Sequence, residues 1–184
     1  MSKNSLPEII QENLQTYIEE IQALVQQPSI SAENLGIETC ADMVLDLFKR
    51  YGFEAQKLPT PGNPMIIAHM KGASEKTLLF YNHYDVQPVD PLEEWVSPPF
   101  KPEIRDGIIY GRGSKDDKGE MVCRLAAVDA LRKAFGGELP CSVVFLVDGE
   151  EEIGSPTIVD FVNEHKDLLK ADAAIWEESY QTPE

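Results

Sequence analysis

Apolar residues recur every three or four positions in several stretches of the chain, and this spacing is typical of amphipathic helices. We expect one helix over residues 6–27, a second over residues 37–50, and a third from residue 118 to the glycine pair at 136–137. Glycine commonly follows the end of a helix, and it does so after the second and third stretches. A shorter helix is expected over residues 156–165.

Short apolar runs of strand length lie between these helices and are bounded by turn-forming residues. They predict strands at residues 53–57, 65–70, 77–82, 108–110, 141–147 and 173–176. The proline-rich stretch from residue 86 to residue 106 is expected to be an ordered loop over the strand ends. Because strands alternate with helices, we expect one α/β domain with a mixed, largely parallel sheet flanked by helices on both faces.

Composition and charge narrow the possible partners. The chain has 184 residues, 42% of them hydrophobic, which is enough for one core. Its 16 Lys and Arg stand against 32 Asp and Glu, and the net charge of −16 repels nucleic acid and anionic membranes but attracts divalent cations. No apolar run approaches the roughly 20 residues of a membrane span. We therefore expect a cytoplasmic protein with no nucleic-acid and no membrane partner.

Polar residues follow two of the predicted strands and precede the third helix. His83 and Asp85 come after one strand, Glu151 and Glu152 follow another, and Asp116 stands just before the helix. Ligands of open α/β sheets bind at the carboxyl ends of the strands, so we expect these five side chains to meet there.

The residue types in these clusters favour a metal site. An imidazole whose second nitrogen is held by a carboxylate keeps one tautomer and presents the other nitrogen to a metal, as His83 and Asp85 could do. The adjacent glutamates 150–152 repel one another, and a bound cation relieves that repulsion. His165 and Asp167 share the same spacing, but they fall on a predicted helix surface and are expected to lie outside the site.

Several other active-site motifs are absent from the sequence. After Gly111 and Gly113, the third glycine of a dinucleotide-binding loop would fall at Asp116, and no Gly-Lys-Ser/Thr phosphate loop occurs. There is no His-Glu-x-x-His zinc motif and no Gly-x-Ser-x-Gly elbow of a serine hydrolase. Three cysteines without a Cys-x-x-Cys spacing indicate neither a disulfide framework nor a thiolate zinc site.

Taken together, the motifs resemble those of the M20 family of metallopeptidases, in the same order and with similar spacing. The segments that carry the resemblance are His83-Tyr84-Asp85, Gly111-Arg112-Gly113-Ser114-Lys115-Asp116-Asp117-Lys118-Gly119, Glu151-Glu152-Ile153-Gly154-Ser155 and the acid after Ile175-Trp176. The resemblance covers nearly the whole chain. The family includes carboxypeptidases, dipeptidases and N-acyl amino acid deacylases.

The resemblance implies a role for each of these residues in a site with two Zn²⁺ ions, for which Co²⁺ or Mn²⁺ are possible substitutes. His83 would bind one zinc and Asp85 would orient it. Asp116 would bridge both metals, Glu151 would be the general base, and Glu152 would bind the second zinc. The resemblance also implies a cis peptide bond after the bridging aspartate.

One further acidic ligand has two candidates. Glu177 directly follows Trp176, as in the dipeptidase-like members, whereas counting from Asp172 favours Glu178. We choose Glu177.

The implied reaction is hydrolysis of an amide bond in a dipeptide or similar small peptide. Two alternatives stay open: an N-acyl amino acid deacylase on the same scaffold, and a non-catalytic metal-binding fragment or paralogue. Family members take a last histidine ligand from beyond an inserted dimerisation domain, and this chain has no candidate for it. Residues 1–184 are therefore expected to be the N-terminal portion of one catalytic domain, inactive alone, from a protein that forms a homodimer.

Overall fold

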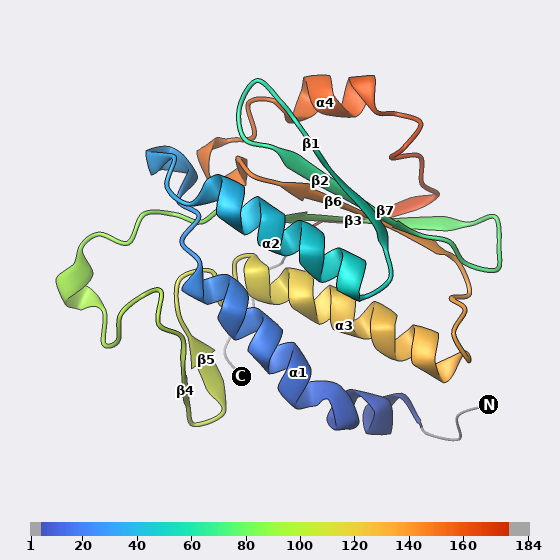
Figure 1. Cartoon of the computed structure of the whole chain (residues 1–184), viewed down its shortest axis with the longest axis horizontal. Coiled ribbons are helices and arrows are strands. Elements are labelled where there is room, and N and C mark those ends of the chain that lie inside the picture. The colour runs from blue at the N-terminus through green and yellow to red at the C-terminus, as the bar shows by residue number, and fades with distance from the viewer. Residues whose placement is uncertain (1–4, 177–184) are drawn as a thin grey trace.

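The computed structural model describes residues 5–176, and its centre is a five-stranded sheet (Figure 1). In spatial order the strands are β1 (Glu54–Leu58), β2 (Met65–Met70), β6 (Ser142–Asp148), β3 (Thr77–His83) and β7 (Ala173–Ile175). β2 is antiparallel to both of its neighbours, while β6, β3 and β7 are parallel to one another. β1 therefore runs in the same direction as β6, and only β2 opposes the rest of the sheet. The expected mixed, largely parallel sheet is confirmed.

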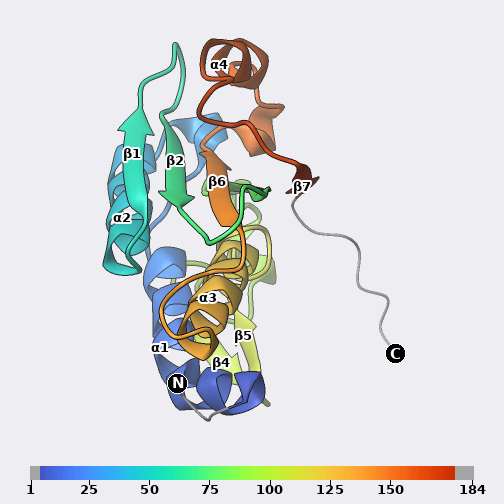
Figure 2. The same ribbon diagram turned by 90° about the vertical axis from the view of Figure 1, so that its right-hand side faces the viewer.

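Helices cover both faces of this sheet, as the edge-on view in Figure 2 shows. α1 (Leu6–Gln26), α2 (Ile37–Arg50) and α3 (Lys118–Ala134) lie on one face, and α4 (Ile158–Glu164) lies on the other. Alternate residues of a strand point to opposite faces. In β2, Ile66 thus packs against the three helices, and Ile67 packs on the α4 side. Neither face of the central strands is left to solvent, which explains their continuous apolar runs.

A small antiparallel hairpin stands apart from the main sheet, at the lower left in Figure 1. It joins β4 (Glu103–Arg105) to β5 (Ile108–Tyr110) through Asp106 and Gly107, whose φ angles are 50° and 79°. Asp-Gly is a preferred pair for such a two-residue turn, because both central residues need a positive φ. The expectation that residues 86–106 contain no regular structure was therefore wrong for β4 and for the short helix η2 (Leu92–Glu94).

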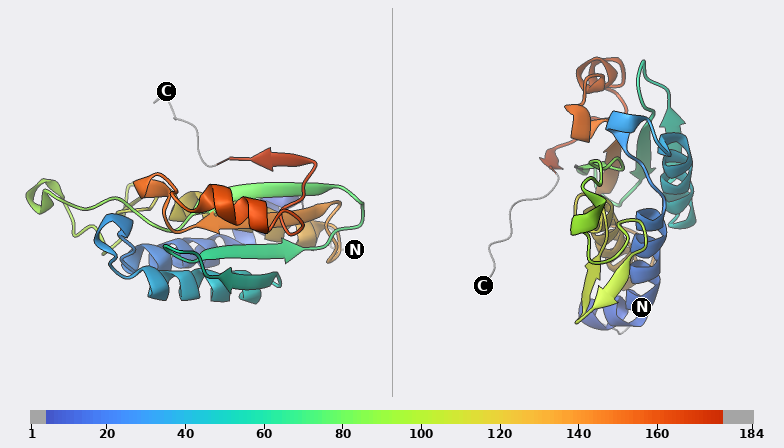
Figure 3. Two further views of the ribbon diagram at one scale, coloured as in Figure 1. Left: turned by 90° about the horizontal axis from the view of Figure 1, so that it is seen from above. Right: turned by 90° about the vertical axis from the view of Figure 1, so that its left-hand side faces the viewer.

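A buried lysine links α3 to the end of α1 through hydrogen bonds. Lys118, the first residue of α3, is fully buried, and its Nζ donates hydrogen bonds to the carbonyl oxygens of Leu24 at 2.9 Å and Gln27 at 2.7 Å. These carbonyls belong to the end of α1, where the helical hydrogen bonds stop; the Leu24 oxygen also accepts the backbone N–H of Gln27 at 3.2 Å. Figure 3 shows α1 and α3 together on one side of the sheet. None of the helices in the described part of the chain is long and apolar enough to cross a bilayer.

Candidate metal centre

The carboxyl ends of β3 and β6 lie side by side, because the two strands are parallel and His83 is paired with Asp148 in their register. His83 is the last residue of β3, and the short 3-10 helix η3 (Glu151–Ile153) begins just after β6. The backbone thus brings the histidine of one strand to the glutamates that follow the other. This is the arrangement expected from the sequence.

His83 is the centre of the cluster, and its side chain is only 1% exposed. Its Nδ1 lies 3.0 Å from the backbone oxygen of Asp85. A carbonyl oxygen only accepts, so Nδ1 carries the hydrogen. The other nitrogen, Nε2, lies 2.8 Å from Asp116 Oδ1 and 3.8 Å from Glu151 Oε2. Nε2 is therefore the nitrogen that faces the carboxylates of Asp116 and Glu151.

Burial lowers the pKa of His83, but its bonds to Asp116 and Asp85 outweigh burial and raise the pKa to about 11. The same contact with His83 lowers the pKa of Asp116. Both shifts have one physical cause, which is a cation surrounded by anions. A proton at Nε2 and a metal ion at Nε2 would meet the same ring of carboxylates.

Asp85 is completely buried and joins the two strand ends. Its carboxylate accepts the backbone N–H of Glu151 at 3.2 Å and that of Glu152 at 3.1 Å. The Oδ1 atom also lies 3.3 Å from His83 Nδ1. Asp85 therefore touches the histidine with its backbone oxygen and its carboxylate, and it fixes the backbone of both glutamates.

The side chains form a set of donor atoms suited to a metal ion. His83, Glu151 and Glu152 each offer one ligand atom, and these atoms all lie within 4.8 Å of one another. Two ligands of a tetrahedral zinc lie about 3.3 Å apart if each is about 2.0–2.2 Å from the metal. Nε2 of His83 and Oδ1 of Asp116 would need to separate by only about half an ångström from their present 2.8 Å. The residue types and their spacing fit a divalent metal ion, and zinc accepts donors of these types.

The peptide bond between Asp116 and Asp117 is cis, as the resemblance implies. The Asp116 side chain is 53% exposed and points to His83, whereas Asp117 is buried. One oxygen of Asp117 accepts the backbone N–H of His83 and the side-chain amide of Asn82, both at 2.8 Å. Burial raises the pKa of Asp117 to about 6, although these hydrogen bonds oppose the rise. The two aspartates thus have different tasks: one faces the site and the other holds the end of β3.

Known proteins resemble this chain in sequence and in fold. The model of the peptidase family M20/M25/M40 matches residues 79–184, which is more than half of the chain. The chain belongs to this family. The crystal structure of an M20 family metallo-carboxypeptidase, Sso-CP2 from Sulfolobus solfataricus, superimposes with a TM-score of 0.84 at 37% identity, covering 89% of this chain and 37% of that one. The di-peptidase Dug1p from Saccharomyces cerevisiae gives a TM-score of 0.85 at 27% identity, covering 95% of this chain and 40% of that one.

One curated relative is named as a desuccinylase and not as a peptidase. The succinyl-diaminopimelate desuccinylase of Dechloromonas aromatica is 34% identical over 137 residues, which cover 74% of this chain and 35% of the relative. The chain thus spans less than half the length of the relatives and structures that it matches.

Within this M20 chain, the acidic run after β6 divides into two kinds of residue. Glu151 and Glu152 face His83, whereas Asp148 and Glu150 are buried and make structural hydrogen bonds. Glu150 accepts the backbone N–H of Asn63 at 3.1 Å and also the hydroxyl of Thr157. Asp148 accepts the N–H of Glu150 and the hydroxyls of Tyr81 and Ser155. Sequence reasoning missed these roles, because an acidic run does not show which of its members turn inward.

Gln87 is another residue that the sequence did not single out. Its side-chain amide donates to the Glu152 carboxylate at 2.7 Å and to the Glu152 backbone oxygen at 3.0 Å. Burial raises the pKa of Glu152, and the bond from Gln87 partly offsets this rise. Gln87 therefore helps to hold the Glu152 side chain at the site.

Two predicted residues lie outside the described part of the chain, namely Glu177 and its rival Glu178. His165, the histidine of the second His-x-Asp sequence, contacts the ring of Phe161 on α4, with 4.4 Å between ring centres. It is the C-cap of α4 and lies outside the donor set, as expected.

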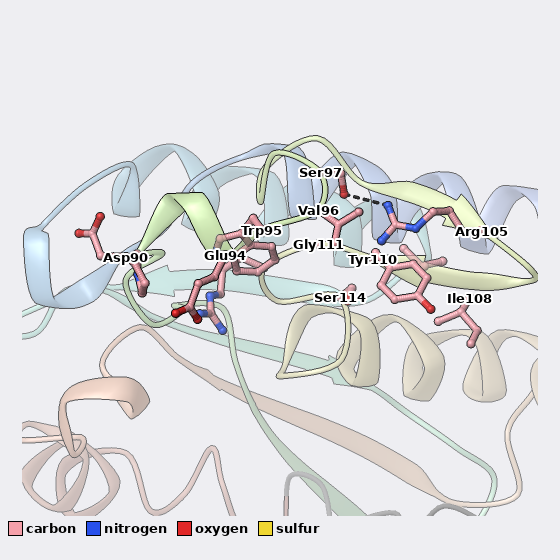
Figure 4. Close-up of a pocket in the computed structure, with 13 residues that line it drawn as sticks. Asp90, Glu94, Trp95, Val96, Ser97, Arg105, Ile108, Tyr110, Gly111 and Ser114 are labelled. Carbon is pink, nitrogen blue, oxygen red and sulfur yellow. Dashed lines mark hydrogen bonds between the residues drawn. The ribbon is translucent and has the colours of Figure 1, made fainter.

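A separate cavity of about 630 Å³ lies between the loop that carries η2 and the β4–β5 hairpin (Figure 4). The Arg105 guanidinium lies 4.0 Å from the ring centre of Tyr110, and that of Arg112 lies 5.2 Å from the ring centre of Trp95. None of its lining residues belongs to the donor set around His83. The cavity is therefore distinct from the candidate metal centre.

Proposed function

We propose that the full-length protein is a dinuclear zinc hydrolase that cleaves the amide bond of dipeptides or similar small peptides. The observation that carries this proposal is the donor set of His83, Glu151 and Glu152 within 4.8 Å, with Asp116 2.8 Å from the histidine. The family membership and the dipeptidase and carboxypeptidase among the similar structures support it.

His83, Asp116, Glu152 and Glu177 would hold the two metal ions. Neutral imidazole and ionised carboxylates are ligands that zinc accepts, and Co²⁺ or Mn²⁺ could replace it with the same donors. When bound, zinc polarises a carbonyl group and lowers the pKa of water. The resemblance to the family assigns the bridging role to Asp116, and its carboxylate is half-exposed and lies 2.8 Å from His83 Nε2.

Glu151 would act as the general base. Its backbone N–H is held by buried Asp85, and its carboxylate points toward His83 Nε2 without touching it, at 3.8 Å. From that place Glu151 could take a proton from the attacking water and deliver it to the leaving amine. Asp85 would keep the proton of His83 on Nδ1 and maintain the distance between the base and the ligands.

A second candidate function is hydrolysis of an N-acyl amino acid, which breaks the same type of bond. The desuccinylases among the curated relatives favour it. A non-catalytic metal-binding paralogue is the remaining alternative, and a lack of turnover in the presence of bound zinc would identify it.

We further propose that this chain forms the N-terminal portion of an M20 catalytic domain and that the full-length protein is a cytoplasmic homodimer. The share of the relatives that the chain covers, 35–40% in the three described above, supports the first point. The acidic net charge of −16 is consistent with a partner that is a small peptide and not a nucleic acid.

The test is a substrate screen on the full-length gene product after metal removal, with and without added zinc. Dipeptides and N-succinyl or N-acetyl amino acids would be compared at equal concentration. Zinc-dependent release of free amino acids from dipeptides supports the peptidase, and selective cleavage of the acylated amino acids supports the deacylase. Absence of both activities from a protein loaded with two zinc ions per chain would contradict the enzyme proposal.

A further inference from the structure

Arg124 lies in the middle of α3 and binds the ends of two strands at once. Its Nη1 donates to the backbone oxygen of Tyr81 at 2.7 Å and to the Asn82 side-chain oxygen at 3.1 Å. Its Nη2 donates to the backbone oxygen of Trp176. Tyr81 and Asn82 precede His83 at the end of β3, and Trp176 follows β7. One guanidinium group therefore joins α3, β3 and the exit of β7.

Within the described residues, few other contacts hold the end of β7. β7 is a three-residue edge strand whose residues are all exposed, and within the sheet it pairs only with β3. The Trp176 ring stacks on Tyr81, with 3.9 Å between centres and 17° between planes, but the residue is 61% exposed. Short, exposed segments of this kind are the first to open locally. The position of the Trp176 carbonyl thus depends strongly on Arg124.

On the β3 side, Arg124 acts through a chain of hydrogen bonds. The Asn82 oxygen accepts from Arg124, so the Asn82 amide nitrogen is turned toward Asp117, to which it donates at 2.8 Å. Asp117 in turn accepts the backbone N–H of His83 at 2.8 Å. Arg124 therefore fixes the orientation of the Asn82 amide, which shares one Asp117 oxygen with the backbone N–H of His83.

We propose that Arg124 is a positioning residue for the zinc that His83 binds. The inference rests on the proposed function, since it concerns how Arg124 positions His83, a proposed ligand of that site. Arg124 reaches the proposed site through β3, whose last residue is His83, and it also binds the Trp176 carbonyl at the exit of the neighbouring strand β7.

The planar, five-donor guanidinium is needed for this task. Its two terminal nitrogens reach acceptors on two different strands in fixed geometry, whereas a lysine ammonium is a single point at the end of a flexible stem. The guanidinium carbon of Arg124 also lies over the Phe80 ring, 5.7 Å from its centre. A methionine at this position would keep apolar packing and remove every donor.

The experiment compares zinc binding in the metal-free full-length protein and in three variants, Arg124→Met, Arg124→Lys and Arg132→Met. Arg132 lies on the same helix and pairs with Asp129 at 3.5 Å, so its replacement is the matched control for loss of an α3 arginine. Each protein is titrated with zinc against a competing chelator. Thermal melting of the metal-free forms and kcat and KM for a cleaved substrate are also measured.

We expect Arg124→Met to weaken one of the two zinc sites by about 10–100-fold, as is typical when a residue that supports a metal ligand is removed. The second site should change by less than about threefold, and kcat should fall more than KM rises. Arg124→Lys should recover part of the affinity, and Arg132→Met should bind like the wild type.

Two results would overturn the inference while the proposed function stands: wild-type zinc binding by Arg124→Met, or equal weakening of both sites together with a lower melting temperature. In the second case Arg124 serves only the stability of the fold. A wild-type protein that binds fewer than two zinc ions would refute the proposed function itself, and the inference with it.

Discussion

Replacing Asp85 by asparagine tests how the site is held together. The Asp85 carboxylate is fully buried and accepts the N–H groups of Glu151 and Glu152 through its two oxygens, at 3.2 Å and 3.1 Å. Asparagine has nearly the same shape but only one oxygen. Whichever way its amide is turned, an NH₂ group faces one of the two backbone donors. One glutamate therefore loses its anchor, and the other keeps a weaker, uncharged acceptor.

The cost follows from these two bonds. A hydrogen bond to a charged group contributes about 1.5–3 kcal/mol, and a buried donor left without an acceptor costs about 1–3 kcal/mol. We expect Asp85→Asn to lower the free energy of unfolding by about 3 kcal/mol. The effect on turnover should also be large, because a shift of about 1 Å in a catalytic group can cost about 100-fold in rate.

The assay is urea denaturation combined with kcat measurement in the full-length protein. Asp167→Asn is the control, since Asp167 occupies the same place in a His-x-Asp sequence but lies exposed after α4. The control should change stability by less than about 0.5 kcal/mol. If Asp85→Asn left the unfolding free energy within that margin and kcat within about threefold of wild type, Asp85 would not be the anchor described here.

Three further outcomes are expected. Glu151→Gln should lower kcat by orders of magnitude while zinc content stays near two per chain, whereas loss of zinc would place Glu151 among the ligands. Lys118→Met removes the donor for the Leu24 and Gln27 carbonyls and should lower the free energy of unfolding by about 2–4 kcal/mol in urea titrations; a change below about 0.5 kcal/mol would show that α1 does not need this cap. Burial lowers the pKa of His69, so the unfolded chain takes up the proton first as pH falls below about 6.5, and stability is lost on acidification. His69→Gln should flatten the decline in stability between pH 7 and pH 5, and an unchanged slope would refute this reasoning.

Much of the fold could be predicted because periodicity reports burial directly. The strand after residue 141 and the helix after Lys118 carry apolar patterns that suit few other structures, and both occur as expected. The direction of a strand could not be predicted in this way, because an apolar run has the same pattern in either direction. β2 is buried on both faces, as the parallel strands of α/β proteins usually are. It is nevertheless antiparallel to β1 and β6. The β4 hairpin was missed because nearby prolines outweighed the Asp106-Gly107 turn signal.

The site residues could be found from sequence because they cluster at strand ends, where parallel strands bring them together. The contacts that support these residues could not be found from the sequence. Asp85 meets the N–H groups of Glu151 and Glu152 across 66 and 67 positions of sequence, and that meeting depends on the register of β3 with β6. From the sequence alone, Arg124 would be taken for an ordinary solvent-exposed residue of a helix. Its contacts arise only because α3 passes over the ends of β3 and β7.

The dinuclear zinc site is tested most directly by anomalous scattering at the zinc absorption edge from crystals of the full-length protein grown with zinc. The proposal predicts two peaks about 3.5–4 Å apart. The Asp116 carboxylate should touch both, with His83 Nε2 bound to one metal and Glu152 to the other. A single peak, or two peaks away from His83 and Asp116, would contradict it.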